Sequence, residues 1–256
     1  MLNILKNYIV KTKILFYPEI VNAGYKVFLY SKELGYEITN DVKDNFDIVF
    51  FNHVSHKDSL HPKDEIIKEL NKSFKTFNID CNNVRKSHVA KIHKEVFGYN
   101  AEPNGTKTIR KSELQSTKQE SFTDIIKNDG YHYMRFIDTY DGDRYHTLRV
   151  PYFNGNIPIV VDVCRNDILK RNHKTDILKV FNPEECFIMP ELDFINQFCN
   201  EFGLDYGELD ILRDINTGKI YIIDVNDKPG IGMLNESDII KTVYIQAFKK
   251  MINDSR

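Results

Sequence analysis

Short apolar runs separated by polar turns dominate the first part of the chain. Residues 26–30 and 47–51 are short, apolar and rich in β-branched or aromatic side chains, and this pattern predicts two strands. Residues 62–70 have the pattern of a helix and are followed by a shorter apolar stretch at 74–79. A strand, a helix and a further strand in this order predict a small α/β layer with parallel pairing, which we assign to residues 1–79.

The middle of the chain begins with a second predicted helix. Apolar residues recur at helical spacing between Val84 and Val96, and the dipeptide Phe97-Gly98 ends the pattern. A strand at 107–111, a polar stretch and an aromatic-rich strand at 131–137 follow. We therefore expect a second, small domain over residues 80–137.

The remainder, residues 138–256, is mostly β-structure with one clear helix. Two apolar runs flank the turn signal Asn154-Gly155 and predict a hairpin of strands 145–152 and 157–164. A helix is predicted to begin at Pro190-Glu191 and to end before Gly203. Two further strands, 207–213 and 219–225, are joined by turn-forming residues and predict a second hairpin.

This second hairpin carries the strongest chemical signal in the sequence. If residues 213 and 219 face each other, alternation of side chains gives one acidic face. That face consists of Glu208, Asp210, Ile222, Asp224 and Asn226. Asp210 and Asp224 would then be diagonal neighbours, about 7–8 Å apart. Oxygen ligands suit Mg²⁺, so we predict a magnesium site here rather than a solvated acidic strand face, since Asp and Asn are poor strand residues.

Cations that could contact phosphate groups also lie at predicted strand positions. They are Lys111, Arg149 and Arg165. Arginine presents a planar fork to phosphate oxygens and lysine a compact charge. Each alone is an ordinary surface cation, but together with the acidic face they predict a site for a metal-bound triphosphate.

Three segments resemble the ATP-grasp superfamily, in particular its carboxylate–amine ligases. The run LDYGELDILRDINTGKIYIIDVNDKPG is similar to the metal-binding end of that fold, in which a strand acid precedes a hairpin and the pattern D-x-N. The segment upstream, RFIDTYDGDRYHTLRVPYFNG, is similar to the part that carries a phosphate-binding arginine. IRKSE resembles the strand with a nucleotide-contacting lysine. The similarity covers residues 80 to 240.

The resemblance implies an α/β and α+β architecture, with a small N-terminal α/β domain and two α+β lobes that clamp a nucleotide. It implies Mg²⁺ on Asp210, Asp224 and Asn226, and phosphates on Lys111 and Arg149. Arg165 would lie near the phosphates or the acceptor substrate. The adenine hinge would be Arg135, Phe136, Ile137 and Asp138.

The activity that the resemblance implies is an ATP- and Mg²⁺-dependent ligase. Such an enzyme activates a small-molecule or peptide-like carboxylate as an acyl phosphate, which an amine or another nucleophile attacks. A phosphotransferase acting on a hydroxyl remains an alternative. A non-catalytic nucleotide-binding module is a third, favoured by the loop SELQSTKQES, which lacks the glycines usual in the family.

The amino-acid composition limits the classes of binding partner. Lys+Arg 35 against Asp+Glu 37 gives a net charge of -2 and no basic excess of the kind that nucleic-acid binders show. The first twenty residues are apolar but interrupted by lysines, so we expect an amphipathic helix or an early strand and no membrane span. No Walker-A or G-x-G-x-x-G pattern occurs. A homodimer is compatible with the sequence, which contains no motif that sets the oligomeric state.

The cysteines and histidines form no sequence motif. The four cysteines show no CxxC spacing, so we expect reduced thiols in a cytoplasmic protein rather than zinc ligands or disulfides. No H-E-x-x-H is present, and the histidines are interpreted as core or surface residues. Cys164, beside Arg165, is expected to be a buried and unreactive thiol.

Overall fold

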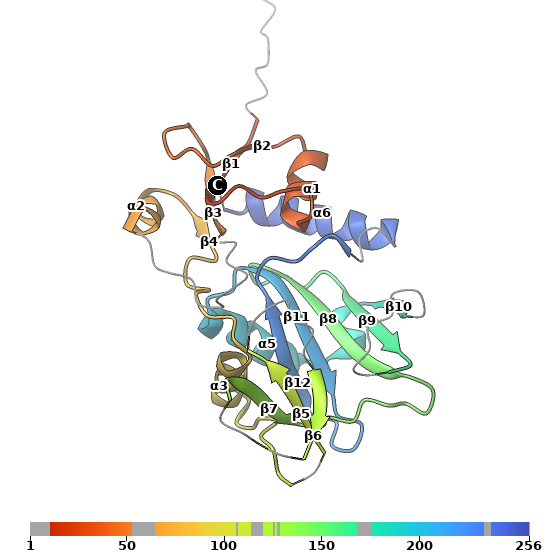
Figure 1. Cartoon of the computed structure of the whole chain (residues 1–256). Helices are drawn as coiled ribbons and strands as arrows, with labels where there is room; N and C mark the ends of the chain where they lie inside the picture. Colours follow the sequence, from red (N-terminus) through yellow and green to blue (C-terminus); the bar gives the residue numbers. More distant parts are fainter. Residues whose placement is uncertain are drawn as a thin grey trace, which may run out of the picture.

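The computed structural model describes residues 11–52, 65–105, 107–113, 120–124, 126, 129–167, 176–232 and 237–255. The strands in these ranges form three sheets, and Figure 1 shows the first in the upper part of the molecule and the other two in the lower part. The strands of each sheet come from one continuous part of the chain, namely 13–77, 108–135 and 145–226. The division into domains at residues 79 and 137 stays a prediction.

The first sheet has four parallel strands, as the sequence predicted for this layer. Its order is β2 (Glu37–Thr39), β1 (Lys13–Pro18), β3 (Ile48–Asn52) and β4 (Thr76–Phe77). Two helices lie along this part of the chain, α1 (Lys26–Glu33) and α2 (Glu65–Ser73). The early strand and the parallel α/β layer are confirmed, whereas residues 1–10 and 53–64 lie outside the described part.

One prediction in this layer was wrong. Residues 26–30, predicted as a strand, begin helix α1. The buried positions of the helix are Lys26, Val27, Tyr30 and Ser31, which is a helical rather than an alternating spacing. The five residues KVFLY are too few to distinguish a helical from an alternating spacing, and Ser31 follows them.

The C-terminal helix α6 (Asp238–Asn253) returns to the first layer. Figure 1 shows it beside α1, with the C-terminus of the chain at the first sheet. Its Tyr244 and Phe248 belong to the same buried cluster as Phe16 and Phe50 of the sheet, and the Phe50 and Phe248 ring centroids are 5.8 Å apart. Ser237 caps the helix by accepting a hydrogen bond from the backbone N–H of Ile240.

The second sheet is a small antiparallel sheet preceded by helix α3 (Lys86–Phe97). Its order is β6 (Glu120–Thr123), β5 (Thr108–Ser112) and β7 (Tyr131–Arg135). Gly98 ends α3 with φ of 75°, a left-handed conformation that glycine adopts without steric cost. The predicted helix and both predicted strands are therefore confirmed.

The third sheet is antiparallel and carries the two predicted hairpins. Its order is β10 (Ile177–Phe181), β9 (Val160–Arg165), β8 (Tyr145–Phe153), β11 (Tyr206–Arg213) and β12 (Ile220–Asn226). The short α4 (Pro183–Cys186) and the longer α5 (Met189–Phe202) precede β11. Side chains of α3 and α5 form one buried cluster with the strands, so these helices cover one face of the sheet. The opposite face of the third sheet is therefore the one that can contact the first and second sheets and carry a functional site.

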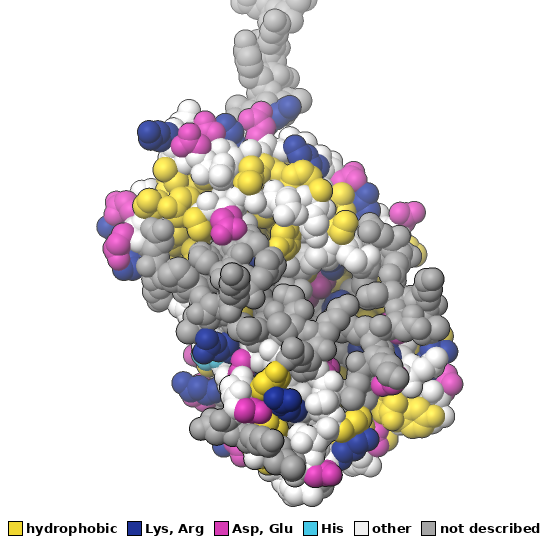
Figure 2. Space-filling model, in the orientation of Figure 1, with side chains coloured by type: hydrophobic (Ala, Val, Ile, Leu, Met, Phe, Trp, Pro, Cys, Tyr) yellow, Lys and Arg dark blue, Asp and Glu magenta, His cyan; other side chains and the backbone are white. Residues whose placement is uncertain are grey.

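The surface carries charges of both signs. Figure 2 shows Lys, Arg, Asp and Glu side chains interspersed over the face in view. Among the described helices, none has the length and apolar character needed to cross a membrane.

Candidate nucleotide and metal site

The acids of the second hairpin lie directly opposite one another. Asp210 of β11 pairs with Asp224 of β12, and Glu208 pairs with Asn226. The predicted diagonal register was wrong, because the turn is one residue longer and the ladder shifts between Asp210 and Ile211. Directly opposite residues of an antiparallel pair have Cα atoms about 4.5–5.5 Å apart, closer than the diagonal that we predicted.

The shift also changes the position of Ile222. This residue, which the sequence placed on the acidic face, lies opposite Ile211. Both isoleucines are buried in the cluster formed with α3 and α5. The acidic face therefore consists of Glu208, Asp210, Asp224 and Asn226, with the apolar core on the other side of the sheet.

Each acid of this face contacts a cation from a different element. The Arg149 guanidinium of β8 donates to Asp210 through Nε at 2.9 Å and Nη2 at 3.3 Å. Lys86, the first residue of α3, donates to the Asp224 carboxylate. Lys26, the first residue of α1, donates to Glu208 in a pair that is almost completely buried. The mutual repulsion of the acids is thus offset by cations.

The pKa shifts follow from this arrangement. The Asp210 carboxylate raises the pKa of Arg149, so its guanidinium remains charged. Burial lowers the pKa of Lys26, and the Glu208 carboxylate partly offsets this effect. The Asp210 carboxylate therefore favours the charged form of Arg149, and the Glu208 carboxylate opposes the effect of burial on Lys26.

Lys26 and Lys86 were missed by sequence reasoning. Lys26 pairs with a residue 182 positions away and Lys86 with one 138 positions away, so no local spacing connects them to the acids. The available signal was weak: Lys26 begins an otherwise apolar run, and Lys86 lies at the start of a predicted helix.

The small sheet contributes a third lysine. Lys111 on β5 is buried, lies 3.7 Å from Glu120 and faces His132 across the ladder. Burial lowers the pKa of His132, and the charges of Lys111 and Lys86 lower it further against the opposing effect of Glu113. Both lysines therefore act on the same imidazole, which places positive charge from α3 and from the small sheet at one edge of the site.

The predicted hinge connects the second and third sheets. The Arg135 guanidinium donates to Asp214 at 3.0 Å and to the Tyr221 hydroxyl at 2.5 Å, so its side chain anchors the hinge to the second hairpin. Ile137 is fully buried in an apolar cluster. The other members are Ile109 and Met134 of the small sheet and Leu212 and Tyr221 of the hairpin. Apolar side chains from both sheets thus meet beside the row of charges.

Comparison with solved structures gives matches along almost the whole chain. The macrocyclase MdnC from Microcystis aeruginosa MRC, bound with precursor peptide MdnA, is 12% identical, with a TM-score of 0.60 over 95% of this chain and 100% of that chain. D-alanine–D-alanine ligase from Bacillus anthracis is 13% identical, with a TM-score of 0.59 over 95% and 96%. The ATP-grasp ligase PsnB with minimal precursor, Mg and ADP is 8% identical, with a TM-score of 0.60 over 94% and 97%.

The chain has the ATP-grasp fold. This agrees with the resemblance found in the sequence, although no protein-family model and no curated protein matches the chain. Within this fold, the acid pair of β11 and β12 and Arg149 of β8 lie on one sheet, and Lys111 lies on β5 of the small sheet.

The structure also places two further predicted residues of the hinge and one of the acidic face. Phe136 lies between the rings of Phe122 and Tyr145, at centroid distances of 5.8 and 6.5 Å. Asp138 accepts a hydrogen bond from the backbone N–H of Tyr140 at 3.0 Å. Asn226 is exposed at the end of β12, where its side-chain oxygen accepts from the backbone N–H of Lys228 at 3.2 Å.

Arg165 lies apart from the acids in this ATP-grasp fold. Its guanidinium donates to the Thr147 hydroxyl at 3.2 Å and lies 3.5 Å from Asp176. The residue is buried at the end of β9, on the ladder position opposite Tyr145. The structure therefore joins Arg149, but not Arg165, directly to the acidic hairpin.

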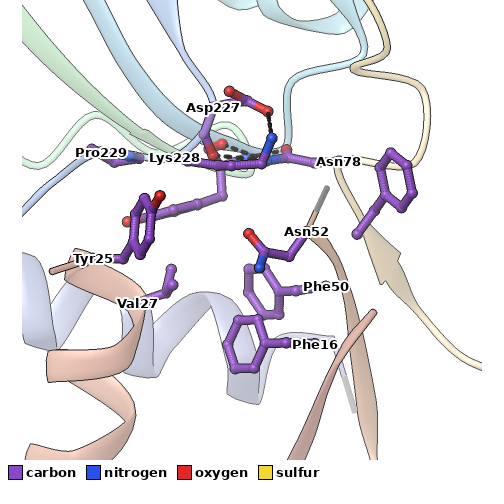
Figure 3. Close-up of a pocket in the computed structure, with 11 residues that line it drawn as sticks. Phe16, Tyr25, Val27, Phe50, Asn52, Asn78, Asp227, Lys228 and Pro229 are labelled. Atoms are coloured by element: carbon purple, nitrogen blue, oxygen red, sulfur yellow. Dashed lines mark hydrogen bonds and ion pairs between the residues drawn. The ribbon is translucent and has the colours of Figure 1, made fainter. Parts of the chain in front are cut away.

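A small pocket, open to solvent, lies just beyond the D-x-N segment. Figure 3 shows Phe16 and Phe50 on one side of it and the Asp227–Pro229 segment on the other. Tyr25, Asn52 and Asn78 add polar groups. Lys228 forms an ion pair with Asp227 at 3.0 Å at the rim. The pocket thus joins the first sheet to the end of the acidic hairpin.

Proposed function

We propose that this chain is an ATP- and Mg²⁺-dependent ligase that activates a carboxylate as an acyl phosphate. The observation that carries the proposal is the opposed pair Asp210 and Asp224, each held by a cation from another element. A metal-bound triphosphate needs both signs of charge within one site, carboxylates for the metal and cations for the phosphates.

The donor set fits Mg²⁺. Asp210, Asp224 and Asn226 offer two carboxylates and one amide oxygen, and Mg²⁺ prefers oxygen ligands while keeping several waters. These residues would hold the metal, which when bound would offset negative charge on phosphate oxygens. No thiol or imidazole lies among these donors.

The cations of the site would exchange partners when the nucleotide binds. Arg149 and Lys86 would move from Asp210 and Asp224 to phosphate oxygens, and Lys111 would bind phosphate from the small sheet. Phosphoryl transfer is catalysed mainly by such positioning and charge stabilisation, so the site needs no nucleophilic side chain. The γ-phosphoryl passes to the carboxylate substrate, a nucleophile displaces the phosphate, and ADP and phosphate leave. Arg165 is retained as a candidate contact for the acceptor.

A peptide-like carboxylate is the substrate class that we favour. Two of the similar proteins have structures with precursor peptides, MdnC with MdnA and PsnB with PsnA2. In this chain the pocket beyond Asn226 combines apolar walls, Phe16 and Phe50, with the polar side chain of Asn52. A peptide substrate would contact these apolar and polar groups where the acidic hairpin ends.

Calorimetric titration of ATP with and without Mg²⁺ tests the nucleotide site. We expect metal-dependent binding that is lost in Asp224→Asn, because the amide cannot replace the carboxylate charge. Asp193→Asn is the matched control, since Asp193 is an exposed carboxylate on α5. Equal binding by both variants would remove Asp224 from the metal site.

Product analysis separates the ligase from a phosphotransferase. Incubation with ATP, a glutamate-rich peptide and hydroxylamine should release phosphate and ADP and give a hydroxamate, the trapped form of an acyl phosphate. A stable phosphopeptide instead of a hydroxamate would support transfer to a hydroxyl. Nucleotide binding without turnover of any acceptor would support the non-catalytic module.

A further inference from the structure

A second cluster of metal-ligating side chains lies on the β8–β9 hairpin, away from the acidic face. His146 and Cys164 are directly opposite each other, and Asp162 is two residues from Cys164 on the same side of β9. These positions alternate with Arg149, so the cluster projects from the other face of the sheet. Helices α3 and α5 cover that face. Val150 and Val160 lie on the same face and belong to the buried cluster formed with these helices.

The three donor atoms lie close together. His146 Nδ1 is 2.8 Å from Asp162 Oδ2, and Cys164 Sγ is 3.7 Å from His146 Nδ1 and 3.4 Å from Asp162 Oδ2. Zinc bonds of about 2.0 to 2.3 Å at tetrahedral angles would separate such donors by about 3.3–3.6 Å. Two of the three separations already match within a few tenths of an ångström, and the third needs a small rotation of one side chain.

The surroundings of the cluster match those of a metal-binding histidine. His146 Nε2 lies 2.9 Å from Asp141 Oδ2, a carboxylate that also accepts hydrogen bonds from the backbone N–H groups of Asp143 and Arg144. A carboxylate on the far ring nitrogen directs Nδ1 toward the metal and fixes the orientation of the ring. Asp141 thus occupies the position of an outer ligand.

Asp162 supplies a second, independent observation. Its side chain is 8% exposed, and its Oδ1 atom has no hydrogen-bond partner among the residues that the structure describes. A buried carboxylate oxygen without a partner is costly unless a cation or water satisfies it. The orphaned oxygen and the three converging donors therefore point to the same missing positive charge.

We propose that His146, Asp162 and Cys164 bind a zinc-like divalent cation, with Asp141 orienting His146 and water in the fourth position. A nitrogen, a thiolate and a carboxylate favour Zn²⁺ over Mg²⁺. Binding replaces the proton shared between His146 Nδ1 and Asp162 and the thiol proton of Cys164, so two protons leave for each ion bound. The ion would join the segment after the hinge to β8 and β9, and this proposal is independent of the nucleotide site.

The test is titration of Zn²⁺ into the full chain, reduced and freed of metal, without nucleotide. We expect one ion per chain and no displacement by excess Mg²⁺. The affinity should fall more than about 100-fold in Cys164→Ser and Asp162→Asn, and about 10–100-fold in Asp141→Asn, the range found for outer-ligand changes. Cys199→Ala, a buried thiol on α5, should bind like the unchanged chain.

Cd²⁺ provides a second measurement, which on the unchanged chain requires no variant to fold. A thiolate ligand gives a charge-transfer absorption in the near ultraviolet, which we expect on adding Cd²⁺ to the unchanged chain and to Cys199→Ala. The same band should be missing in Cys164→Ser. Binding without this band, equal affinity in Cys164→Ser, or no binding of either ion would overturn the proposal and leave a hydrogen-bonded cluster.

Discussion

Replacing Lys26 by methionine should destabilise the fold more than any exposed lysine change. Lys26 and Glu208 have side chains only 2% and 5% exposed, and the lysine ammonium also lies 4.7 Å from the centre of the Tyr244 ring. Lys26→Met keeps the length of the side chain but leaves the Glu208 carboxylate buried without its partner. Removing one member of such a pair costs about 3–5 kcal/mol in the free energy of unfolding.

A more exposed lysine–glutamate pair that also involves α1 provides a control. Lys241 of α6 pairs with Glu33 of α1, but these side chains are 32% and 44% exposed. An exposed pair contributes about 0–1 kcal/mol, so Lys241→Met should be nearly neutral. The difference between the two variants reports on burial, because both substitutions replace a lysine paired with a glutamate by methionine.

Urea unfolding followed by circular dichroism provides the measurement. The double variant Lys26→Met, Glu208→Leu removes both charges and should recover most of the stability lost in Lys26→Met, since apolar replacement of a buried pair is often neutral. A loss below about 1 kcal/mol in Lys26→Met, equal to that of the control, would refute the reasoning. So would a double variant less stable than the single one.

Two further predictions concern Lys111 and His93. Lys111→Ala should raise the Michaelis constant for ATP at least about tenfold, or about 1.4 kcal/mol, and a value equal to that of the unchanged chain would remove Lys111 from the site. Burial lowers the pKa of His93 to about 4, and its ring nitrogens have no hydrogen-bond partner in the described part of the chain. Between pH 6.5 and 4 the unfolded chain therefore binds a proton that the folded chain does not, and stability falls as the pH falls. From pH 7 to 5 this loss is about 2 kcal/mol, and His93→Phe, which keeps the ring stack on Phe97, should remove it in urea unfolding at the two pH values. An unchanged pH dependence in that variant would contradict the assignment.

The acidic face was predictable although its register was not. The prediction paired residues whose numbers sum to 432, whereas the structure pairs Asp210 with Asp224, which sum to 434. A slip of two residues leaves every side chain on the same face, while a slip of one reverses it. Asp210 and Asp224 therefore lie on one face, as predicted. The ladder shifts by one residue between this pair and Ile222, so Ile222 lies on the other face.

The elements marked by glycine were also predictable, since Gly98 and Gly203 end α3 and α5 in left-handed conformations. What the sequence could not supply were contacts between distant segments. Lys26 and Lys86 resemble any other lysine until α1 and α3 pack against the hairpin. The same holds for His146, whose partners Asp162 and Cys164 come from the next strand and form no short motif.

The charges of the acidic hairpin and its three cations cancel, and this balance determines what the small sheet would contribute to nucleotide binding. Lys26, Lys86 and Arg149 balance Glu208, Asp210 and Asp224 one for one. A magnesium-bound triphosphate still carries net negative charge, so on the proposed function further positive charge has to enter when it binds. Lys111 is the cation in position to supply it, because it is buried on β5 and its ion pair with Glu120 is long, at 3.7 Å. Nucleotide binding would therefore draw the second sheet toward the third, and the affinity for ATP would depend on both sheets rather than on the acidic hairpin alone.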